Sequence, residues 1–373
     1  MGISRLMLTG FRSYPAVSLA LDPEPVVLLG ENGAGKTNLI EAISLLGPGR
    51  GLRGAALAEL PHRKAEAEPE TGAWAVAAKL TLAGDMLDLG TGLSPEMERR
   101  IGRCDGVTVS LTRLAEHIRL IWLTPAMDRL FVEAPSGRRK FLDRLVLALD
   151  PQHAGRSSAY ERAMRERNRL LRDGPKDPFW LDGLEAEMAR HGVQIAAARL
   201  TMVQRLGAVL GEPGPFPQPR LALEGPLEAQ LAAGESADAL TESYAASLAR
   251  ARPRDEAAGR TLQGPHMSDL IVTHGASGRP AAQCSTGEQK ALLIALILAE
   301  ARLIAAEAPE ACPILLLDEI SAHLDERRRA ALFDALCALR LQAWLTGTDS
   351  GAFAGLGTRA QRLHIAPGRI TPL

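Results

Sequence analysis

The sequence lacks the features that mark membrane or exported proteins. Its longest candidate for a membrane span, Ala291 to Ala299, is enclosed by Lys290 and Glu300 and is far too short to cross a bilayer. The first residues contain no signal-peptide core, and Leu6 occupies the position where a myristoylation signal needs serine or threonine. These absences argue against a membrane-embedded or exported protein.

Cysteine is also scarce. The four cysteines are scattered and form no paired metal-ligand spacing; they are Cys104, Cys284, Cys312 and Cys337. This usage fits a reducing compartment, so we expect a cytoplasmic protein.

The sequence also lacks a large net charge of either sign. The chain has 43 lysines and arginines against 44 aspartates and glutamates, for a formal net charge of −1. Any binding of nucleic acid must therefore come from local patches rather than from a basic body. The 46% hydrophobic and 23% charged content is typical of a soluble globular protein. Because 373 residues exceed one ordinary core, we expect two lobes or an inserted subdomain.

What the sequence does contain is a phosphate-loop pattern at residues 30–37: glycine, four residues, Gly-Lys and then threonine. A short apolar run, Pro25 to Leu29, precedes the loop, and residues 38–46 read as the start of a helix. The motif requires this strand-loop-helix context. The context argues against a glycine-rich turn that meets the pattern by chance.

Each residue type of the loop has a physical role. Gly30, Gly33 and Gly35 permit positive φ and carry no Cβ, so successive N–H groups can turn towards a polyphosphate. The helix N-terminus adds partial positive charge. Lys36 is expected to reach the β- and γ-phosphates, and the Thr37 hydroxyl to take one place on a magnesium ion.

The remaining patterns indicate an α/β fold interrupted by helices. Patches with strand patterning occur at 3–8, 17–21, 74–90, 99–113 and 118–123. Residues 47–72 are expected to form a surface excursion. Helical patterning runs from Pro135 to about Leu210, with breaks near Pro151 and at 174–178, and is expected to pack as an antiparallel arm.

Proline and glycine cluster at 211–217 and mark a boundary after the helices. We therefore expect three segments: the first half of an ATPase lobe at 1–132, a helical arm at 133–213, and the second half of the ATPase lobe at 214–373.

Within the arm, four arginines fall on one helix face. At about 100° per residue they lie within roughly 80° of one another; they are Arg162, Arg165, Arg169 and Arg172. The stripe could follow a nucleic-acid backbone, since arginine suits phosphate. An ordinary solvated helix face explains the pattern equally well.

A second chemical motif ends the apolar run from Pro313 to Leu317, which is followed by Asp318 and Glu319. Such a run is typical of a buried parallel strand whose C-terminal end faces a nucleotide. Asp318 is expected to hold the magnesium shell, and Glu319 to polarise the attacking water.

A third motif, Ser285 to Gln289, precedes a strongly apolar helix at 291–305 and could form an anion site at a helix N-terminus. As an isolated motif it would be read as a capping box. In this order, however, the three motifs resemble the ATP-binding-cassette class of ATPases, with Ser285 to Gln289 as the signature.

In that class the signature of one subunit completes the nucleotide site of the other, so two ATP molecules are sandwiched in a dimer. The resemblance implies that Ser285, Gly287 and Gln289 act across the interface, and that His323 and Asp325 lie in the loop coupling the two sites. The cofactors expected are ATP and Mg²⁺. On the phosphate-loop side the nucleotide site comprises Gly30, Asn32, Gly33, Ala34, Gly35, Lys36, Thr37 and Asn38.

Residues 10–14, Gly-Phe-Arg-Ser-Tyr, are similar to the DNA-repair and chromosome-maintenance (SMC-like) branch of the class, where the equivalents of Arg12 and Ser13 reach the nucleotide. The chain as a whole resembles the RecF family of bacterial recombination mediators. The matching segments are Phe11 to Tyr14, Gly30 to Ile43, Pro135 to Asp143, Arg165 to Leu171, Gly264 to His266 with Asp269 and Leu270, and Ser285 to Leu292.

This resemblance implies an ATP-dependent homodimer that binds duplex and gapped DNA in the nucleoid. It further implies work with RecR and RecO in loading RecA during gap repair, replication and the SOS response, with weak, DNA-dependent ATP hydrolysis that releases the dimer. The fold implied is an SMC-like head with a parallel sheet around the phosphate loop, an N-terminal antiparallel β element and an inserted helical arm.

Two residues of the cassette pattern are absent. No glutamine occurs before Gln152, so the magnesium-sensing glutamine expected after Leu123 is missing, and Thr124 or Asp128 could take its place. The switch histidine expected at 343–349 is also missing, where Thr348 is the substitute.

Two other functions remain open at this point. A transporter motor subunit would carry the missing glutamine and histidine and a shorter helical lobe. A chromosome-tethering protein would have a coiled-coil arm several times longer.

Overall fold

The computed structural model describes residues 1–62, 72–82, 84–94, 96, 99–174, 177–211, 214–320 and 324–373. The chain forms two compact units. Unit 1 comprises Met1–Asp128, Pro213–Pro217 and Ser285–Leu373, and unit 2 comprises Arg129–Glu212 and Gln218–Cys284. Unit 2 therefore contains residues 218–284 in addition to the segment expected as a helical arm. In the described part of the chain, no helix combines the length and apolarity needed to cross a membrane.

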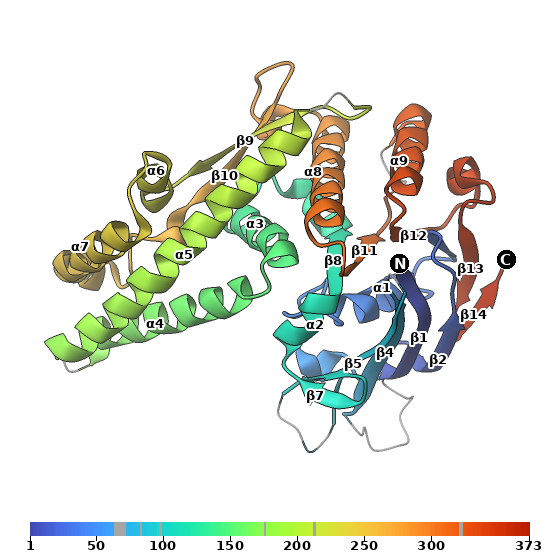
Figure 1. Cartoon of the computed structure of the whole chain (residues 1–373), viewed down its shortest axis with the longest axis horizontal. Helices are drawn as coiled ribbons and strands as arrows, with labels where there is room; N and C mark the ends of the chain where they lie inside the picture. The colour runs from blue at the N-terminus through green and yellow to red at the C-terminus, as the bar shows by residue number, and fades with distance from the viewer. Residues whose placement is uncertain are drawn as a thin grey trace. The chain divides into compact units, whose positions relative to one another are not determined.

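Unit 1 contains two six-stranded sheets (Figure 1). The first is antiparallel, in the order β2-β1-β4-β5-β6-β7. Its strands are β1 (Gly2–Phe11), β2 (Tyr14–Ala20), β4 (Trp74–Thr81), β5 (Met86–Leu93), β6 (Ile101–Cys104) and β7 (Val107–Val109). The alternation of apolar and polar residues in β1 produces one buried face, as predicted.

The second sheet has the order β14-β13-β3-β12-β11-β8 and is parallel except for the β13–β14 pair. Its strands are β3 (Val26–Leu29), β8 (Ile118–Leu123), β11 (Cys312–Leu317), β12 (Gln342–Gly347), β13 (Gln361–Ala366) and β14 (Arg369–Pro372). Every residue of β3, β11 and β12 is buried. The continuous apolar runs follow from this burial on both faces.

Helix α1 (Lys36–Ser44) shares one core with both sheets of unit 1. Leu39 and Ile40 of α1 belong to the same buried cluster as Leu6 of β1 and Leu316 of β11. The other helices of the unit are α2 (Leu111–His117), α8 (Thr286–Glu307) and α9 (Glu326–Leu339); α8 packs on β8 and β11. The phosphate-loop helix is thus fixed by packing on two sides.

The expected surface excursion at 47–72 lies partly outside the described residues, from 63 to 71. In the described part, Leu60 is buried and Pro61 forms an isolated β-bridge with Phe11. The Arg12 backbone N–H donates to Leu60 O at 2.8 Å. This stretch therefore packs against the end of β1.

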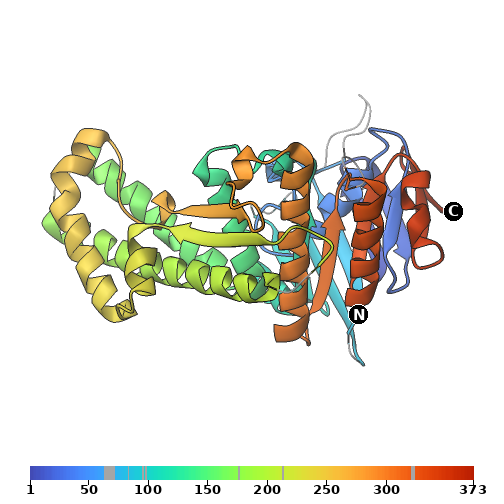
Figure 2. The ribbon, with the colours of Figure 1, turned by 90° about the horizontal axis from the view of Figure 1, so that it is seen from above.

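Unit 2 is built from five α-helices and a two-stranded sheet in its described residues. The helices are α3 (Pro135–Leu149), α4 (His153–Asp173), α5 (Pro178–Leu210), α6 (Pro226–Ala232) and α7 (Ala237–Ala258), and the strands are β9 (Pro219–Glu224) and β10 (Asp269–His274). The predicted helix breaks near Pro151 and at 174–178 are confirmed. Helices α4 and α5 pack on each other, and β9 runs alongside α5 (Figure 2).

A fully buried arginine organises the centre of unit 2. The Arg167 guanidinium donates to Glu185 at 2.9 Å, to Asp255 at 2.8 Å and to Thr261 at 2.8 Å. It also donates to the Leu248 carbonyl at 2.8 Å. These contacts join α4, α5 and α7, because a buried charge must be paired and hydrogen-bonded.

Candidate nucleotide-binding site

The phosphate loop forms between β3 and α1 as its glycines require. Gly33 and Gly35 have φ of 82° and 110°, in the left-handed region that other residues avoid. A Cβ on Gly30 would lie 2.2 Å from the Ile365 carbonyl oxygen of β13. Positive φ at two positions and close packing at the third explain why these positions are glycine.

The Lys36 side chain curls over the loop. Its Nζ donates to the carbonyl oxygens of Gly30 and Glu31, both at 2.7 Å, and the residue is 5% exposed. Burial lowers the pKa of the Lys36 ammonium, while the nearby carboxylates of Glu319 and Asp318 act to raise it. The Lys36 ammonium therefore lies where phosphate oxygens could replace the carbonyl oxygens of Gly30 and Glu31 as its hydrogen-bond acceptors.

The acidic pair lies next to the loop. The Thr37 hydroxyl donates to Asp318 Oδ1 at 3.1 Å, and the two residues are 281 positions apart in the chain. The Asp318 backbone N–H donates to Leu123 O of β8 at 2.9 Å. Asp318 is buried, whereas Glu319 is exposed and has a positive φ of 49°. The structure therefore brings Lys36, Thr37 and both carboxylates together, as the sequence predicts.

A magnesium ion fits these residues. A threonine hydroxyl and a carboxylate are both hard oxygen ligands, and here they already lie within hydrogen-bond distance of each other. Among the described residues no cluster of three His, Cys, Asp or Glu side chains could hold a metal by itself. Thr37 and Asp318 would therefore supply two oxygen ligands to a Mg²⁺ ion.

Arg12 and Ser13, the expected nucleotide contacts from the N-terminal motif, lie beside α1. The Arg12 guanidinium donates twice to the Glu41 carboxylate, at 3.0 and 2.9 Å, and Glu41 is fully buried. Ser13 Oγ accepts from Asn38 Nδ2 at 3.0 Å. A Cβ on Gly35 would lie 2.8 Å from Ser13 Oγ, so the motif directly adjoins the loop.

Two residues of this region were not predicted from the sequence. Tyr14 donates its hydroxyl to the Gly35 carbonyl at 3.0 Å, and burial raises the pKa of Tyr14 to about 12, so it remains a donor. Glu41 accepts from Arg53 at 3.3 Å as well as from Arg12. A carboxylate inside an apolar helix turn is a signal that could have indicated a buried partner for an arginine.

The signature residues begin helix α8. Ser285 is the exposed N-cap, and its side chain forms a reciprocal capping box with Glu288. Its backbone N–H donates to Glu288 Oε2 at 2.8 Å. Gly287 is half-buried and Gln289 is 6% exposed. The structure thus contains the capping box; the phosphate role of these three residues stays a prediction.

The structure describes all three residues suggested in place of the missing glutamine and histidine: Thr124, Asp128 and Thr348. Asp128 accepts from Lys290 Nζ of α8 at 2.6 Å, and Thr124 is buried. Thr348 is exposed beyond the end of β12. Of the coupling loop, His323 lies outside the described residues, and Asp325 is the N-cap of α9.

At the end of β12, Thr346 contacts the acidic pair. Its hydroxyl donates to Asp318 Oδ1 at 2.7 Å and accepts from the Glu319 N–H at 2.8 Å. Thr346 could not be recognised from the sequence, because its contacts depend on the order of the strands.

The four arginines of the predicted stripe are all exposed on α4 in unit 2. Three of them have acidic neighbours on the same helix: Arg165 lies 3.6 Å from Glu161, Arg172 lies 2.6 Å from Asp173, and Arg169 pairs with Glu166. Exposed pairs of this kind are weak, so the arginines can exchange them for phosphate. The face exists, and DNA binding by it stays a prediction.

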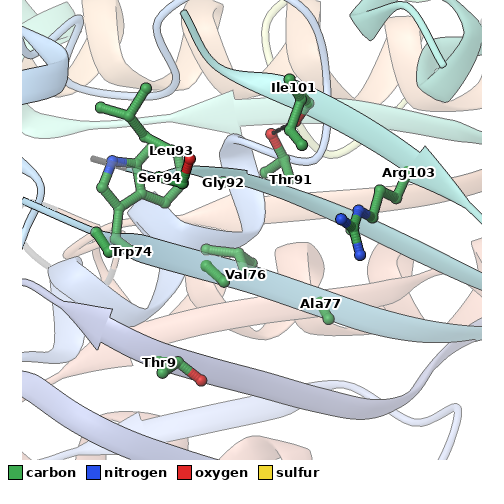
Figure 3. Close-up of a pocket in the computed structure, with 13 residues that line it drawn as sticks. Thr9, Trp74, Val76, Ala77, Thr91, Gly92, Leu93, Ser94, Ile101 and Arg103 are labelled. Carbon is green, nitrogen blue, oxygen red and sulfur yellow. Dashed lines mark hydrogen bonds between the residues drawn. The ribbon is translucent and has the colours of Figure 1, made fainter. Parts of the chain in front are cut away.

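A cavity of about 430 Å³ lies on the antiparallel sheet (Figure 3). Small side chains produce it, since Ala75 and Ala77 of β4 stand opposite Gly92 and Gly90 of β5. None of the described lining residues belongs to the phosphate loop, the acidic pair or the signature. The cavity is therefore separate from the nucleotide site.

The fold and the phosphate site define an ATPase of the ATP-binding-cassette class with an SMC-like head. A family model described as RecF/RecN/SMC N terminal domain matches residues 2–356. The DNA replication and repair protein RecF of Mesorhizobium japonicum is 50% identical, covering 99% of this chain and 97% of that protein. The RecF of Rhizobium johnstonii is 51% identical, with coverage of 99% and 98%. The chain belongs to the RecF family.

Solved structures agree on the fold. A structure of the recombination mediator protein RecF-ATPrS has a TM-score of 0.83 at 22% identity. The match covers 100% of this chain and 98% of the other. The prediction of an SMC-like head with a helical insertion is therefore confirmed.

Proposed function

We propose that this chain is an ATP-dependent, DNA-binding recombination mediator of the RecF type. It dimerises on ATP, binds duplex and gapped DNA, and promotes RecA loading in gap repair, replication and the SOS response. The observation that carries the proposal is the convergence of Lys36, Thr37 and Asp318 at one end of the parallel sheet. Membership of the RecF family supports a role in DNA repair.

In this proposal the phosphate loop binds ATP when hydrogen bonds within the loop are replaced by hydrogen bonds to the phosphates. The Lys36 ammonium gives up the carbonyls of Gly30 and Glu31 for the β- and γ-phosphates. The N–H groups from Gly30 to Asn38, including those of Asn32 and Ala34, surround the phosphates. Thr37 and Asp318 would hold Mg²⁺, which when bound neutralises charge on the phosphates.

Hydrolysis is assigned to Glu319. Its carboxylate is exposed next to the buried Asp318, so it can orient a water molecule and accept a proton from it. The missing glutamine and histidine imply weaker sensing of the γ-phosphate. Slow, DNA-dependent hydrolysis that releases the dimer is therefore expected.

Dimerisation would place the signature of one copy against the nucleotide of the other. The signature residues Ser285, Gly287 and Gln289, of which Ser285 is exposed, would complete the site in trans. Arg12 and Ser13 would act within the copy that holds the phosphate loop. The stripe on α4 would contact the DNA backbone. RecR and RecO would be the protein partners, in the nucleoid region of the cytoplasm.

The test is sedimentation of the Glu319→Gln variant, which prevents turnover. With ATP and Mg²⁺ the variant should sediment as a dimer that carries a gapped DNA duplex, because closure of the sandwich needs the γ-phosphate and not its hydrolysis. ADP in place of ATP, and Lys36→Ala in the same background, are the matched controls and should leave a monomer.

Absence of a dimer with ATP would contradict the nucleotide sandwich. A dimer that forms with ATP but does not bind the duplex would be consistent with the ATPase chemistry and would contradict the DNA-repair assignment. A transporter motor or another protein-directed switch would then be the better explanation.

A further inference from the structure

The strand order of the parallel sheet places Thr346 between the two nucleotide motifs. Strand β12 lies between β3, which leads into the phosphate loop, and β11, which leads into the acidic pair. The C-terminal ends of parallel strands share one edge of the sheet. Thr346, near the end of β12, therefore lies next to Asp318 at this edge, and it is completely buried.

The Thr346 hydroxyl both donates and accepts a hydrogen bond. Its single proton goes to Asp318 Oδ1 at 2.7 Å, the same oxygen that accepts from Thr37 Oγ1 at 3.1 Å. Its oxygen accepts the backbone N–H of Glu319 at 2.8 Å. One hydroxyl thus contacts the side chain of the first acidic residue and the backbone of the second.

The backbone of Glu319 needs such support. Its φ of 49° is in the left-handed region, which disfavours any residue with a Cβ. This conformation turns the chain out of β11 directly after Asp318, so the first carboxylate is buried and the second is exposed. The N–H bond to Thr346 fixes the residue at which the chain turns.

We propose that Thr346 is a positioning residue that orients both carboxylates of the ATPase site. The inference rests on the proposed ATPase function and assigns to this residue a task within it. Without the hydroxyl, Asp318 Oδ1 loses one of its two donors and the Glu319 N–H loses its acceptor. The Asp318 carboxylate can then rotate away from Thr37, and the turn at Glu319 can relax.

The experiment compares Thr346→Val, which keeps the shape and removes the hydroxyl, with Thr346→Ser, which keeps the hydroxyl. Thr358→Val is the matched control, because Thr358 is an exposed threonine of the same unit and lies outside the nucleotide motifs. Two quantities are measured: kcat and KM for ATP, and the Mg²⁺ concentration that half-saturates binding of the fluorescent probe mant-ADP. The second readout does not depend on turnover.

Thr346→Val should lower kcat roughly tenfold or more, the loss expected when a buried hydrogen-bond partner is removed. The Mg²⁺ midpoint should rise several-fold, while probe affinity at saturating Mg²⁺ stays within about threefold, because Lys36 and the loop are untouched. Thr346→Ser and Thr358→Val should stay within about threefold of the wild type in both quantities.

Wild-type kcat and Mg²⁺ midpoint in a folded Thr346→Val variant would overturn the inference alone. Equal losses in Thr346→Ser would also overturn it, since methyl packing and not the hydroxyl would then be responsible. If the valine variant does not fold, Thr346→Cys against Thr346→Ser asks the same question with one atom changed. A wild-type chain that neither binds the probe nor hydrolyses ATP would overturn the proposed function together with the inference.

Discussion

At the scale of single residues, Asp143 of α3 shows how unit 2 uses ionised groups for stability. Its carboxylate accepts from Arg199 at 2.7 and 2.8 Å and contacts His153 Nε2 at 2.8 Å. Burial acts to raise the pKa of Asp143, but the hydrogen bonds from His153 and Arg199 outweigh it and lower the pKa to about 2. The ordinary value is 3.8, so the folded state favours the ionised form.

This shift makes the stability of unit 2 sensitive to acid. A depressed pKa contributes stability that is present above pH 3.8 and is lost as the pH falls towards 2. The loss from this group should be roughly 2 kcal/mol. Asp143→Asn should remove that part of the pH dependence, measured by urea unfolding at several pH values, whereas Asp238→Asn, at an exposed position of α7, should retain it. Equal slopes for the wild type and Asp143→Asn would contradict the argument.

Residues of contiguous motifs could be predicted from the sequence to lie together, while their roles with nucleotide stay predictions. The phosphate loop and the Asp318–Glu319 pair each carry their meaning in a few neighbouring residues, and the structure brings them together. Thr346 could not be predicted, because its role comes from the position of β12 in the sheet. The partner of Arg12 was missed for the same reason, since Glu41 meets it only when α1 packs against the end of β1.

At the scale of elements, α4 presents two kinds of arginine on opposite sides. At about 100° per residue, Arg167 lies roughly opposite the centre of the stripe formed by Arg162, Arg165, Arg169 and Arg172. Arg167 is buried among acidic partners, and the stripe is exposed. Composition alone cannot distinguish the buried arginine from the exposed ones. The helical period predicts that the four arginines of the stripe share one face of α4. That Arg167 is buried follows only from the fold.

The exposed face can be tested by the salt dependence of DNA binding. Replacing Arg165 and Arg169 with alanine should reduce the slope of log K against log salt by about 2, because each phosphate contact releases close to one counterion. The matched control is the double replacement of Arg190 and Arg254, which are exposed arginines elsewhere in unit 2. Fluorescence anisotropy of a labelled duplex from low to moderate salt measures the slope. An unchanged slope would make α4 a scaffold only.

At the scale of the whole molecule, each of the two units contains a core cluster of its own in its described residues. The cluster around α1 belongs to unit 1, and the cluster formed by residues such as Tyr160, Met188 and Leu248 belongs to unit 2. The sequence predicted the lobe architecture and the helical insertion. It did not predict that α6, α7 and the β9–β10 pair join the helices of the arm, because that packing depends on contacts between distant segments.

Because each unit contains its own core cluster, we expect nucleotide to stabilise the two units unequally. ATP binds only the folded form of unit 1, so at a concentration 100-fold above Kd it should stabilise that unit by about 2.7 kcal/mol. Hydrogen exchange should slow for amides of α1 and β11 and change little in the core around Arg167. Lys36→Ala should abolish the protection. Equal protection of both cores in the wild type would show that the units open as one.

The pairing of β3 also sets the order in which the molecule can be made. This strand pairs only with β12 and β13 in the described chain, and its register joins Val26 to Trp344 and to Gln361. During synthesis, more than 300 further residues must be added after β3 before β12 and β13 are made. At ordinary rates of synthesis this takes about 15–60 s. Residues 129–284 can meanwhile collapse on their own core. The nucleotide site would be among the last parts of the newborn chain to form, because a nascent chain cannot complete the neighbours of the phosphate loop before synthesis has passed β13.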